Sequence, residues 1–147
     1  MQNKGKKTVS GISICHDKSI IIFSACLIMS NNHHILSSRC SRVVLAGAAV
    51  PRGRKTSSFA SCACNTLRCL QCNFKVHCFS GCAWDSTVDY MFLRNTVPNE
   101  TKLAARLVRD SDSCAYCCQC SYASESGERE LALQGARGDP QWICAGH

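Results

Sequence analysis

The chain has 147 residues, a formal net charge of +7 and 14 cysteines, a length that fits one domain and excludes two full hydrophobic cores. Hydrophobic residues make up 46% of the sequence, but this figure includes every cysteine, and aromatic residues reach only 7%. A core this poor in large side chains predicts an additional stabilising feature, such as disulfides or a structural metal ion.

The positive charge is concentrated in the first part of the chain. Residues 1–60 contain nine Lys and Arg residues and one acid, whereas residues 61–147 contain eight basic residues and nine acids. A nucleic-acid-binding surface needs clustered basic residues, so no nucleic acid partner is expected for the nearly neutral second part. Residues 1–39 are interpreted as a poorly ordered N-terminal segment.

The apolar run Ser19–Met29 is the candidate for a membrane or targeting segment. Its 11 residues fall short of the roughly 20 that cross a bilayer, and no small-x-small cleavage site follows it directly. We therefore expect no transmembrane segment and an intracellular domain, in which cysteines stay reduced.

After this run, residues 40–60 are rich in small residues, Gly, Pro and Ser, which predicts a linker. The alternating apolar residues of Leu70–Val76 predict a half-buried strand. The apolar run Val88–Leu93 fits either a buried strand or a helical turn. Two further strands are expected at Tyr116–Tyr122 and Gln141–Cys144.

The clearest helix is predicted over Pro98–Arg109. Proline is tolerated in a first helical turn, and Asn99 can cap the helix. Lys102, Arg106 and Arg109 would share one face of it as a basic stripe. This stripe is either a solvated face or a docking site for acidic protein segments or acidic membrane lipid.

The cysteines suggest the chemistry of the domain, because three spacings suit a metal ion. They are Cys69-x-x-Cys72, Cys118-x-Cys120 and Cys144-x-x-His147. A structural zinc takes four such ligands, and these spacings supply six. Our preferred zinc set is Cys69, Cys72, Cys144 and His147, with Cys118 and Cys120 as the substitute pair.

Other readings of the cysteines remain open. Reduced cysteine can simply pack as a small hydrophobic residue. An even number of cysteines also suits a disulfide framework, but the chain has no convincing secretory signal. A redox role for the Cys-x-x-Cys pair lacks the βαβ context that such motifs have.

Arg94 is the remaining candidate binding residue. Alternating aromatics in an apolar run usually face inward, so Tyr90 and Phe92 are expected in the core. Arg94 then either forms an ion pair with Asp85 or Asp89 or reaches solvent as part of a binding surface, where a partner's carboxylate or phosphate can meet it.

Several ordered blocks of the sequence resemble the retinal-maintenance family of cilia- and flagella-associated protein 418. The similarity covers about residues 40–147, and residues 1–39 do not follow the family's acidic N-terminal half. The blocks that carry it are CNTLRCLQC with Phe74, WDSTVDYMFLRN, Pro98, KLAARL, AYCCQCSY and the closing QWICAGH.

The resemblance implies a non-enzymatic ciliary protein that supports photoreceptor maintenance and outer-segment disc morphogenesis. It also implies ciliary or photoreceptor proteins as partners, and a location in the cytoplasm near the ciliary base or in the photoreceptor inner segment. The residues themselves show no nucleophile with a paired base, as an enzyme would need. The alternative is a zinc-binding nucleic-acid or protein-interaction module. We thus expect a small cysteine-rich α+β domain over residues 61–147, stapled by zinc.

Overall fold

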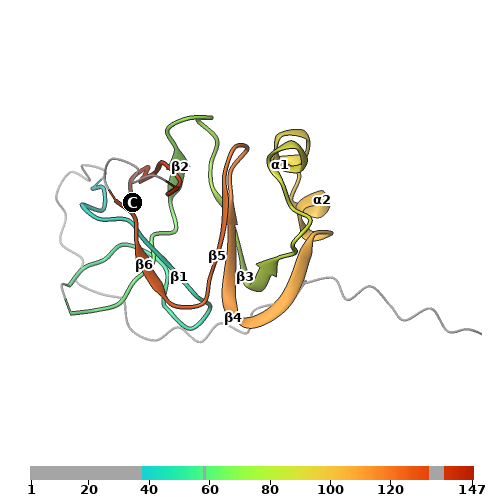
Figure 1. The fold of residues 1–147 in the computed structure, drawn as a ribbon. Coiled ribbons are helices and arrows are strands. Elements are labelled where there is room, and N and C mark those ends of the chain that lie inside the picture. Colours follow the sequence, from blue (N-terminus) through green and yellow to red (C-terminus); the bar gives the residue numbers. More distant parts are fainter. Residues whose placement is uncertain (1–37, 58, 133–137) are drawn as a thin grey trace, which may run out of the picture.

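A computed structural model describes residues 38–57, 59–132 and 138–147 of the chain (Figure 1). The expectation for the N-terminal segment therefore falls almost entirely outside the described residues. The elements, in chain order, are β1 (Val44–Ala46), β2 (Leu67–Cys69), β3 (His77–Trp84), α1 (Tyr90–Thr96), α2 (Glu100–Ala104), β4 (Leu107–Cys117), β5 (Tyr122–Glu125), β6 (Glu128–Glu130) and β7 (Trp142–Cys144).

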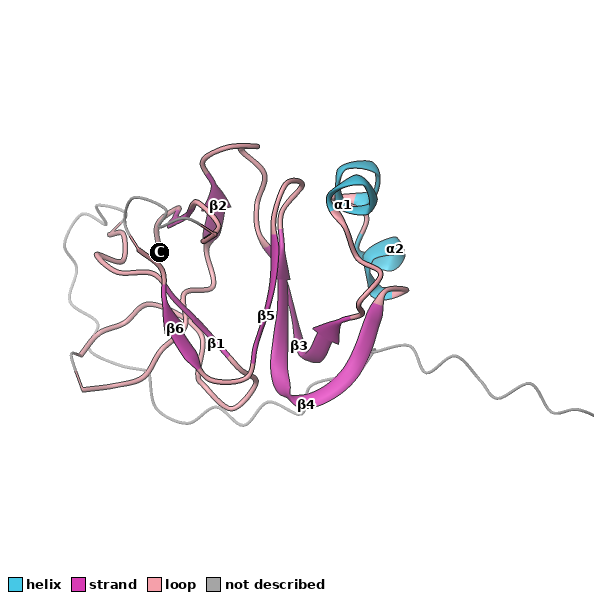
Figure 2. Ribbon diagram, in the orientation of Figure 1, coloured by secondary structure: helices cyan, strands magenta, loops and turns pink. Residues whose placement is uncertain are grey.

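The centre of the fold is an antiparallel sheet in the order β3-β4-β5. Two small antiparallel ribbons accompany it, β1 with β6 and β2 with β7. The helices lie on one side of the sheet and the ribbons on the other (Figures 1 and 2). This arrangement agrees with the expected α+β class of short strands in a cysteine-rich domain.

Strand β4 separates two hydrophobic cores. Successive side chains of a strand point to opposite faces, so Cys114 and Tyr116 face the ribbons while Ala115 and Cys117 face the helices. All four are at most 1% exposed. The core on the helix side also contains Trp84, Val88, Leu93, Val97 and Leu103. Both faces of β4 are thus buried over residues 113–117, whereas residues 108–112 are exposed.

The segment expected as a linker contributes to the core on the ribbon side. Within it, β1 is buried at every position, and the Tyr116 hydroxyl donates to Ala46 O at 2.7 Å and accepts from Ala46 N at 3.0 Å. A strand buried on both faces shows no alternation of polar and apolar residues. The periodicity that reveals a half-buried strand is therefore missing from this part of the sequence.

The predicted helix over Pro98–Arg109 is shorter in the structure. Asn99 caps α2 by accepting from Lys102 N at 3.0 Å, as expected, but the helix ends at Ala104. Leu107 then pairs with Trp84 in the sheet. Pairing with β3 requires an extended chain, and it outweighs the local helical preference.

The apolar run Val88–Leu93, expected as a buried strand or a helical turn, leads into helix α1, which Asp89 caps by accepting from Phe92 N at 2.7 Å. One other segment differs from expectation. The strand expected over Leu70–Val76 is replaced by a turn between β2 and β3, where Asn73 adopts a left-handed φ of 61°. The closing strand, β7, lies where it was predicted.

Candidate metal centres

The structure gathers eight potential metal ligands into two groups of four. The mixed cluster consists of Cys40, Cys64, Cys144 and His147, and the four-cysteine cluster consists of Cys69, Cys72, Cys118 and Cys120. In each group the ligand atoms lie within 4.8 Å of one another. The preferred set from the sequence is therefore divided: each spacing pair stays together, but the two pairs lie in different clusters.

The ribbon of β2 and β7 positions both clusters. Its register pairs Leu67 with Cys144 and Cys69 with Trp142. Cys144 belongs to the mixed cluster, whereas Cys69 belongs to the four-cysteine cluster. The two clusters therefore lie toward opposite ends of a three-residue ladder.

Backbone hydrogen bonds bring the remaining ligands of the mixed cluster together. Cys64 N donates to Val44 O at 3.2 Å, which ties the chain before β2 to β1. His147 N donates to Ser38 O at 3.3 Å, and its imidazole Nε2 lies 3.2 Å from Cys40 Sγ and 3.7 Å from Cys64 Sγ. The cluster thus joins three segments that are far apart in sequence.

Two tight turns form the four-cysteine cluster. One links Cys69 to Cys72 and is closed by Asn73 N donating to Cys69 O at 3.1 Å. The other follows β4, where Cys118 N donates to Ser121 O at 2.9 Å. Cys118 and Cys120 therefore meet across a turn and not, as expected, on one face of a strand.

The distances within both clusters suit a tetrahedral zinc site. A zinc–sulfur bond of about 2.3 Å places two tetrahedral sulfurs about 3.8 Å apart, and a sulfur and a nitrogen slightly closer. Cys120 Sγ lies 3.5 Å from Cys69 Sγ and 3.7 Å from Cys118 Sγ. Three cysteines with one histidine and four cysteines are both common zinc donor sets. The residues therefore fit the metal in ligand type and in spacing.

Each cluster contains one thiol that ionises near neutral pH. Burial opposes ionisation of Cys144, but hydrogen bonds from Thr66 and from neighbouring backbone N–H groups lower its pKa to about 6. In the four-cysteine cluster, burial opposes ionisation of Cys72, while hydrogen bonds from Phe74 N–H and Cys69 lower its pKa to about 7. Burial raises the pKa of Cys64 to about 12. A divalent cation would favour the thiolate form of every ligand.

Sequence reasoning missed Cys40 and Cys64 as candidate ligands. Neither has a short spacing to another residue of the mixed cluster: Cys40 lies 107 positions before His147, and Cys64 lies 83 positions before it. Their position depends on the pairing of β2 with β7 and on the contact of Cys64 with β1. No local signal in the sequence encodes these long-range contacts.

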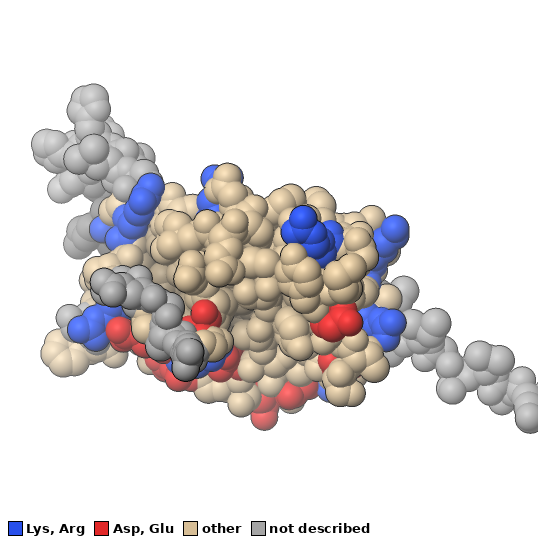
Figure 3. Space-filling view, turned by 45° about the horizontal axis from the view of Figure 1, so that its top comes forward, with Lys and Arg blue, Asp and Glu red and all other residues tan. Residues whose placement is uncertain are grey.

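The basic stripe does not form on one helical face. Lys102 is exposed on α2, but Arg106 follows the helix and Arg109 lies in β4, opposite Cys82. Arg106 Nη1 is 4.0 Å from Asp85 Oδ2 and donates to the Thr87 hydroxyl. In the face shown in Figure 3, basic side chains form separate groups near the edges, and acidic ones gather along the lower part.

The expectations for Arg94 and its neighbours are met only in part. Phe92 is half-buried against the helix-side core, but Tyr90 is 46% exposed. Arg94 donates to the Tyr90 hydroxyl at 3.1 Å and lies over its ring. Asp85 and Asp89, the expected partners, instead contact Arg106 and cap α1.

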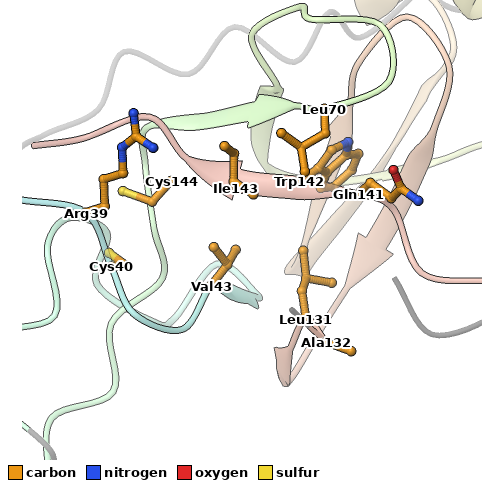
Figure 4. Close-up of a pocket in the computed structure, with 10 residues that line it drawn as sticks. All are labelled: Arg39, Cys40, Val43, Leu70, Leu131, Ala132, Gln141, Trp142, Ile143 and Cys144. Atoms are coloured by element: carbon orange, nitrogen blue, oxygen red, sulfur yellow. The ribbon is translucent and has the colours of Figure 1, made fainter. Parts of the chain in front are cut away.

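A pocket of about 400 Å³ lies beside the mixed cluster. Cys40 and Cys144 line one end of it, and Leu70, Leu131 and Trp142 line the other (Figure 4). The mixed cluster is thus close to a partly apolar depression of the surface. Within the described residues, no helix is long and apolar enough to cross a membrane.

The sequence of this chain is similar to known proteins over most of its length. Cilia- and flagella-associated protein 418 of Danio rerio is 40% identical over 120 residues, which are 80% of this chain and 56% of the relative. The proteins of the same name from Rattus norvegicus and Homo sapiens are 37% and 35% identical over 76% of this chain, and 51% and 52% of their own lengths. The chain therefore spans about half the length of these relatives.

No solved structure matches the chain. The model of the Retinal Maintenance family matches residues 15–147, which include both candidate metal clusters. The resemblance noted in the sequence is thereby confirmed, and the chain belongs to the Retinal Maintenance family, whose relatives here are cilia- and flagella-associated proteins.

Proposed function

We propose that this chain is a non-enzymatic ciliary protein of photoreceptors, which supports outer-segment disc morphogenesis and photoreceptor maintenance by binding or scaffolding. Membership of the Retinal Maintenance family and the ciliary name of the relatives support this role. Its place would be the cytoplasm near the ciliary base and in the photoreceptor inner segment. Its partners would be ciliary or photoreceptor proteins.

Two structural zinc ions would hold the binding surface in place. The observation that carries this part of the proposal is the complete set of four protein ligands in each cluster. A catalytic zinc keeps an open position for water or substrate, whereas a structural zinc does not. Closed ligand sets favour a role for zinc in folding, because a small domain with few large core residues gains stability from metal binding.

The exposed side of α1 is the surface that we propose for the partner. Tyr90 and Met91 of α1 are 46% and 58% exposed, and Arg94 lies over the Tyr90 ring. Tyr122, the first residue of β5, lines the same depression as Tyr90 and is 44% exposed. Tyrosine, methionine and arginine are enriched where proteins bind one another. Arg94 also has further N–H groups that could meet a carboxylate of a protein or the phosphate of an acidic membrane lipid.

A paired measurement of metal content and binding tests this proposal. The purified chain should contain two zinc ions, and a tagged copy in ciliated cells should co-purify ciliary proteins. The double substitution Tyr90→Ala with Arg94→Ala should keep the zinc and the melting temperature but lose those proteins. Val108→Ala is the matched control, since Val108 is equally exposed, at 46%, but lies on β4 and not on α1.

Two results would contradict the proposal. An unchanged set of co-purified ciliary proteins for the double variant would exclude the α1 surface. A fully folded chain without zinc, indifferent to chelator, would exclude the structural metal and leave packed thiols as the explanation.

A further inference from the structure

Arg52 joins two cysteines that lie outside both metal clusters. Cys78 is exposed on β3, and Cys114 is fully buried on β4. Arg52 Nη1 donates to Cys78 Sγ, and Nη2 donates to Cys114 Sγ. One guanidinium therefore contacts both sulfurs at once.

The sheet places these cysteines on the same face. Cys78 is opposite Tyr116, and Cys114 is opposite Ser80, so the cysteines are diagonal neighbours in the β3–β4 ladder. Diagonal neighbours are farther apart than directly paired residues. A bulge between Ser80 and Cys82 interrupts the ladder just beyond Cys78 and gives β3 room to adjust.

The position of Arg52 is fixed by its surroundings. Its guanidinium lies over the Tyr116 ring, 5.4 Å from the centroid. The backbone around it is held by Ala63, which donates to Pro51 O at 2.9 Å and accepts from Gly53 N at 2.8 Å. The positive charge is therefore built into the site and does not depend on a mobile surface side chain.

The electrostatics favour one thiolate and one thiol in the pair. The hydrogen bond with Cys78 and the charge of Arg52 outweigh burial and lower the pKa of Cys114 to about 6. The same hydrogen bond raises the pKa of Cys78. At neutral pH the pair then carries one negative charge beside Arg52, and a thiolate in such an electropositive setting is the nucleophilic form of cysteine.

We propose that Cys78 and Cys114, joined by Arg52, form a dithiol that reacts with hydroperoxides and closes to a reversible intramolecular disulfide. Peroxide reaches the pair from the exposed Cys78 side, and the Cys114 thiolate attacks one peroxide oxygen. The S–O bond forms, the O–O bond breaks, and the released hydroxide takes the proton of the second thiol to become water.

The second thiolate then attacks the sulfenic sulfur. The S–S bond forms, the S–O bond breaks, and hydroxide leaves. The two sulfurs lose two electrons in total, and the peroxide is reduced to water and hydroxide. Hydrogen peroxide is the only co-reactant that these steps need.

Mass spectrometry of the zinc-loaded full chain tests the proposal. Hydrogen peroxide should remove two hydrogen atoms from the intact mass, and a thiol reductant should restore them. After alkylation of free thiols, a tryptic digest should link the peptides of residues 76–94 and 110–129, with fragment ions placing the bond at Cys78 and Cys114. A link between other cysteines, or sulfenic acid without any link, would overturn the proposal.

Arg52→Gln tests whether the guanidinium matters. With a pKa of about 6 the reactive thiol is about nine-tenths ionised at pH 7, whereas at its ordinary 9.0 about one-hundredth would be ionised. Thiolates of lower pKa are intrinsically weaker nucleophiles, here by about 20-fold. Disulfide formation should therefore be up to about fourfold slower in Arg52→Gln at pH 7, should match the wild type near about pH 7.7 and should be faster above it, because the wild-type rate is level there while that of the variant still rises.

Two matched variants keep the interpretation clear. Arg42→Gln removes another arginine, which pairs with Glu130 and contacts no sulfur, so its rate should equal that of the wild type. Cys78→Ser changes an exposed side chain and should keep the melting temperature while abolishing the link. An unchanged pH profile of the rate in Arg52→Gln, or a persistent link in Cys78→Ser, would refute the assignment.

Discussion

Replacing Cys117 and Cys118 one at a time distinguishes a metal ligand from a cysteine that only packs in the core. Cys117 and Cys118 are both fully buried at the end of β4, but only Cys118 belongs to a candidate metal cluster. Cys117 instead packs in the helix-side core. Cys117→Ala and Cys118→Ala remove the same atoms from equally buried positions, so packing alone predicts similar costs.

If zinc is bound, the two substitutions should lower the free energy of unfolding by very different amounts. Removing one buried sulfur should lower the free energy of unfolding by about 1 kcal/mol, comparable with a small core truncation. Cys118 also accepts a hydrogen bond from Trp142 Nε1 at 3.2 Å, which adds about 1 kcal/mol. Loss of a zinc ligand should raise the total for Cys118→Ala to about 4 kcal/mol or more, because zinc binding is coupled to folding.

Urea unfolding and metal analysis together check this prediction. We expect Cys117→Ala to keep two zinc ions per chain and Cys118→Ala to keep one. In the presence of a strong chelator, the difference between the variants should shrink to about 1 kcal/mol, the value of the lost hydrogen bond. Equal metal content and costs within about 1 kcal/mol of each other would refute the ligand role of Cys118.

Two further predictions concern the core around β1. Tyr116→Phe should cost about 1–3 kcal/mol below pH 10, because both buried backbone groups of Ala46 lose their partner. Burial raises the pKa of Tyr116 to about 12, so the wild type should lose roughly 2 kcal/mol more than Tyr116→Phe as pH rises from 10 to 12. Equal pH profiles for both proteins would contradict this. Gly47→Ala should cost about 1–3 kcal/mol in thermal unfolding, since its methyl group would collide with the backbone oxygens of Asp112 and Ser126. Gly127→Ala, which meets no neighbour, should cost clearly less.

The sequence predicted local chemistry well and long-range pairing poorly. The short spacings Cys69-x-x-Cys72 and Cys144-x-x-His147 each remain together in the structure, because a few residues suffice to form a turn. Which pair joins which depends on the ladder of β2 with β7 and on the turn after β4. These contacts span many residues and leave no periodic signal in the sequence.

The family and the fold class could also be predicted, the first from ordered sequence blocks and the second from the short apolar runs. The limits of helices and strands could not. The α2 helix ends early because β3 recruits Leu107 into the sheet, and β1 is hidden because both its faces are buried. In each case tertiary contacts, and not local preference, decide the conformation.

The two clusters are nested along the chain, and this order matters while the protein is being synthesised. Cys69 and Cys120 are 51 residues apart, whereas Cys64 and His147 are 83 apart and enclose them. Closing the longer loop costs only about 0.4 kcal/mol more entropy, so loop length hardly favours either site. Synthesis from the N-terminus does distinguish them: the four-cysteine cluster is complete once residue 120 has emerged from the ribosome, but the mixed cluster also needs Cys144 and His147. Zinc could then bind in the interior of the domain before it joins the segments of Cys40, Cys64 and Cys144.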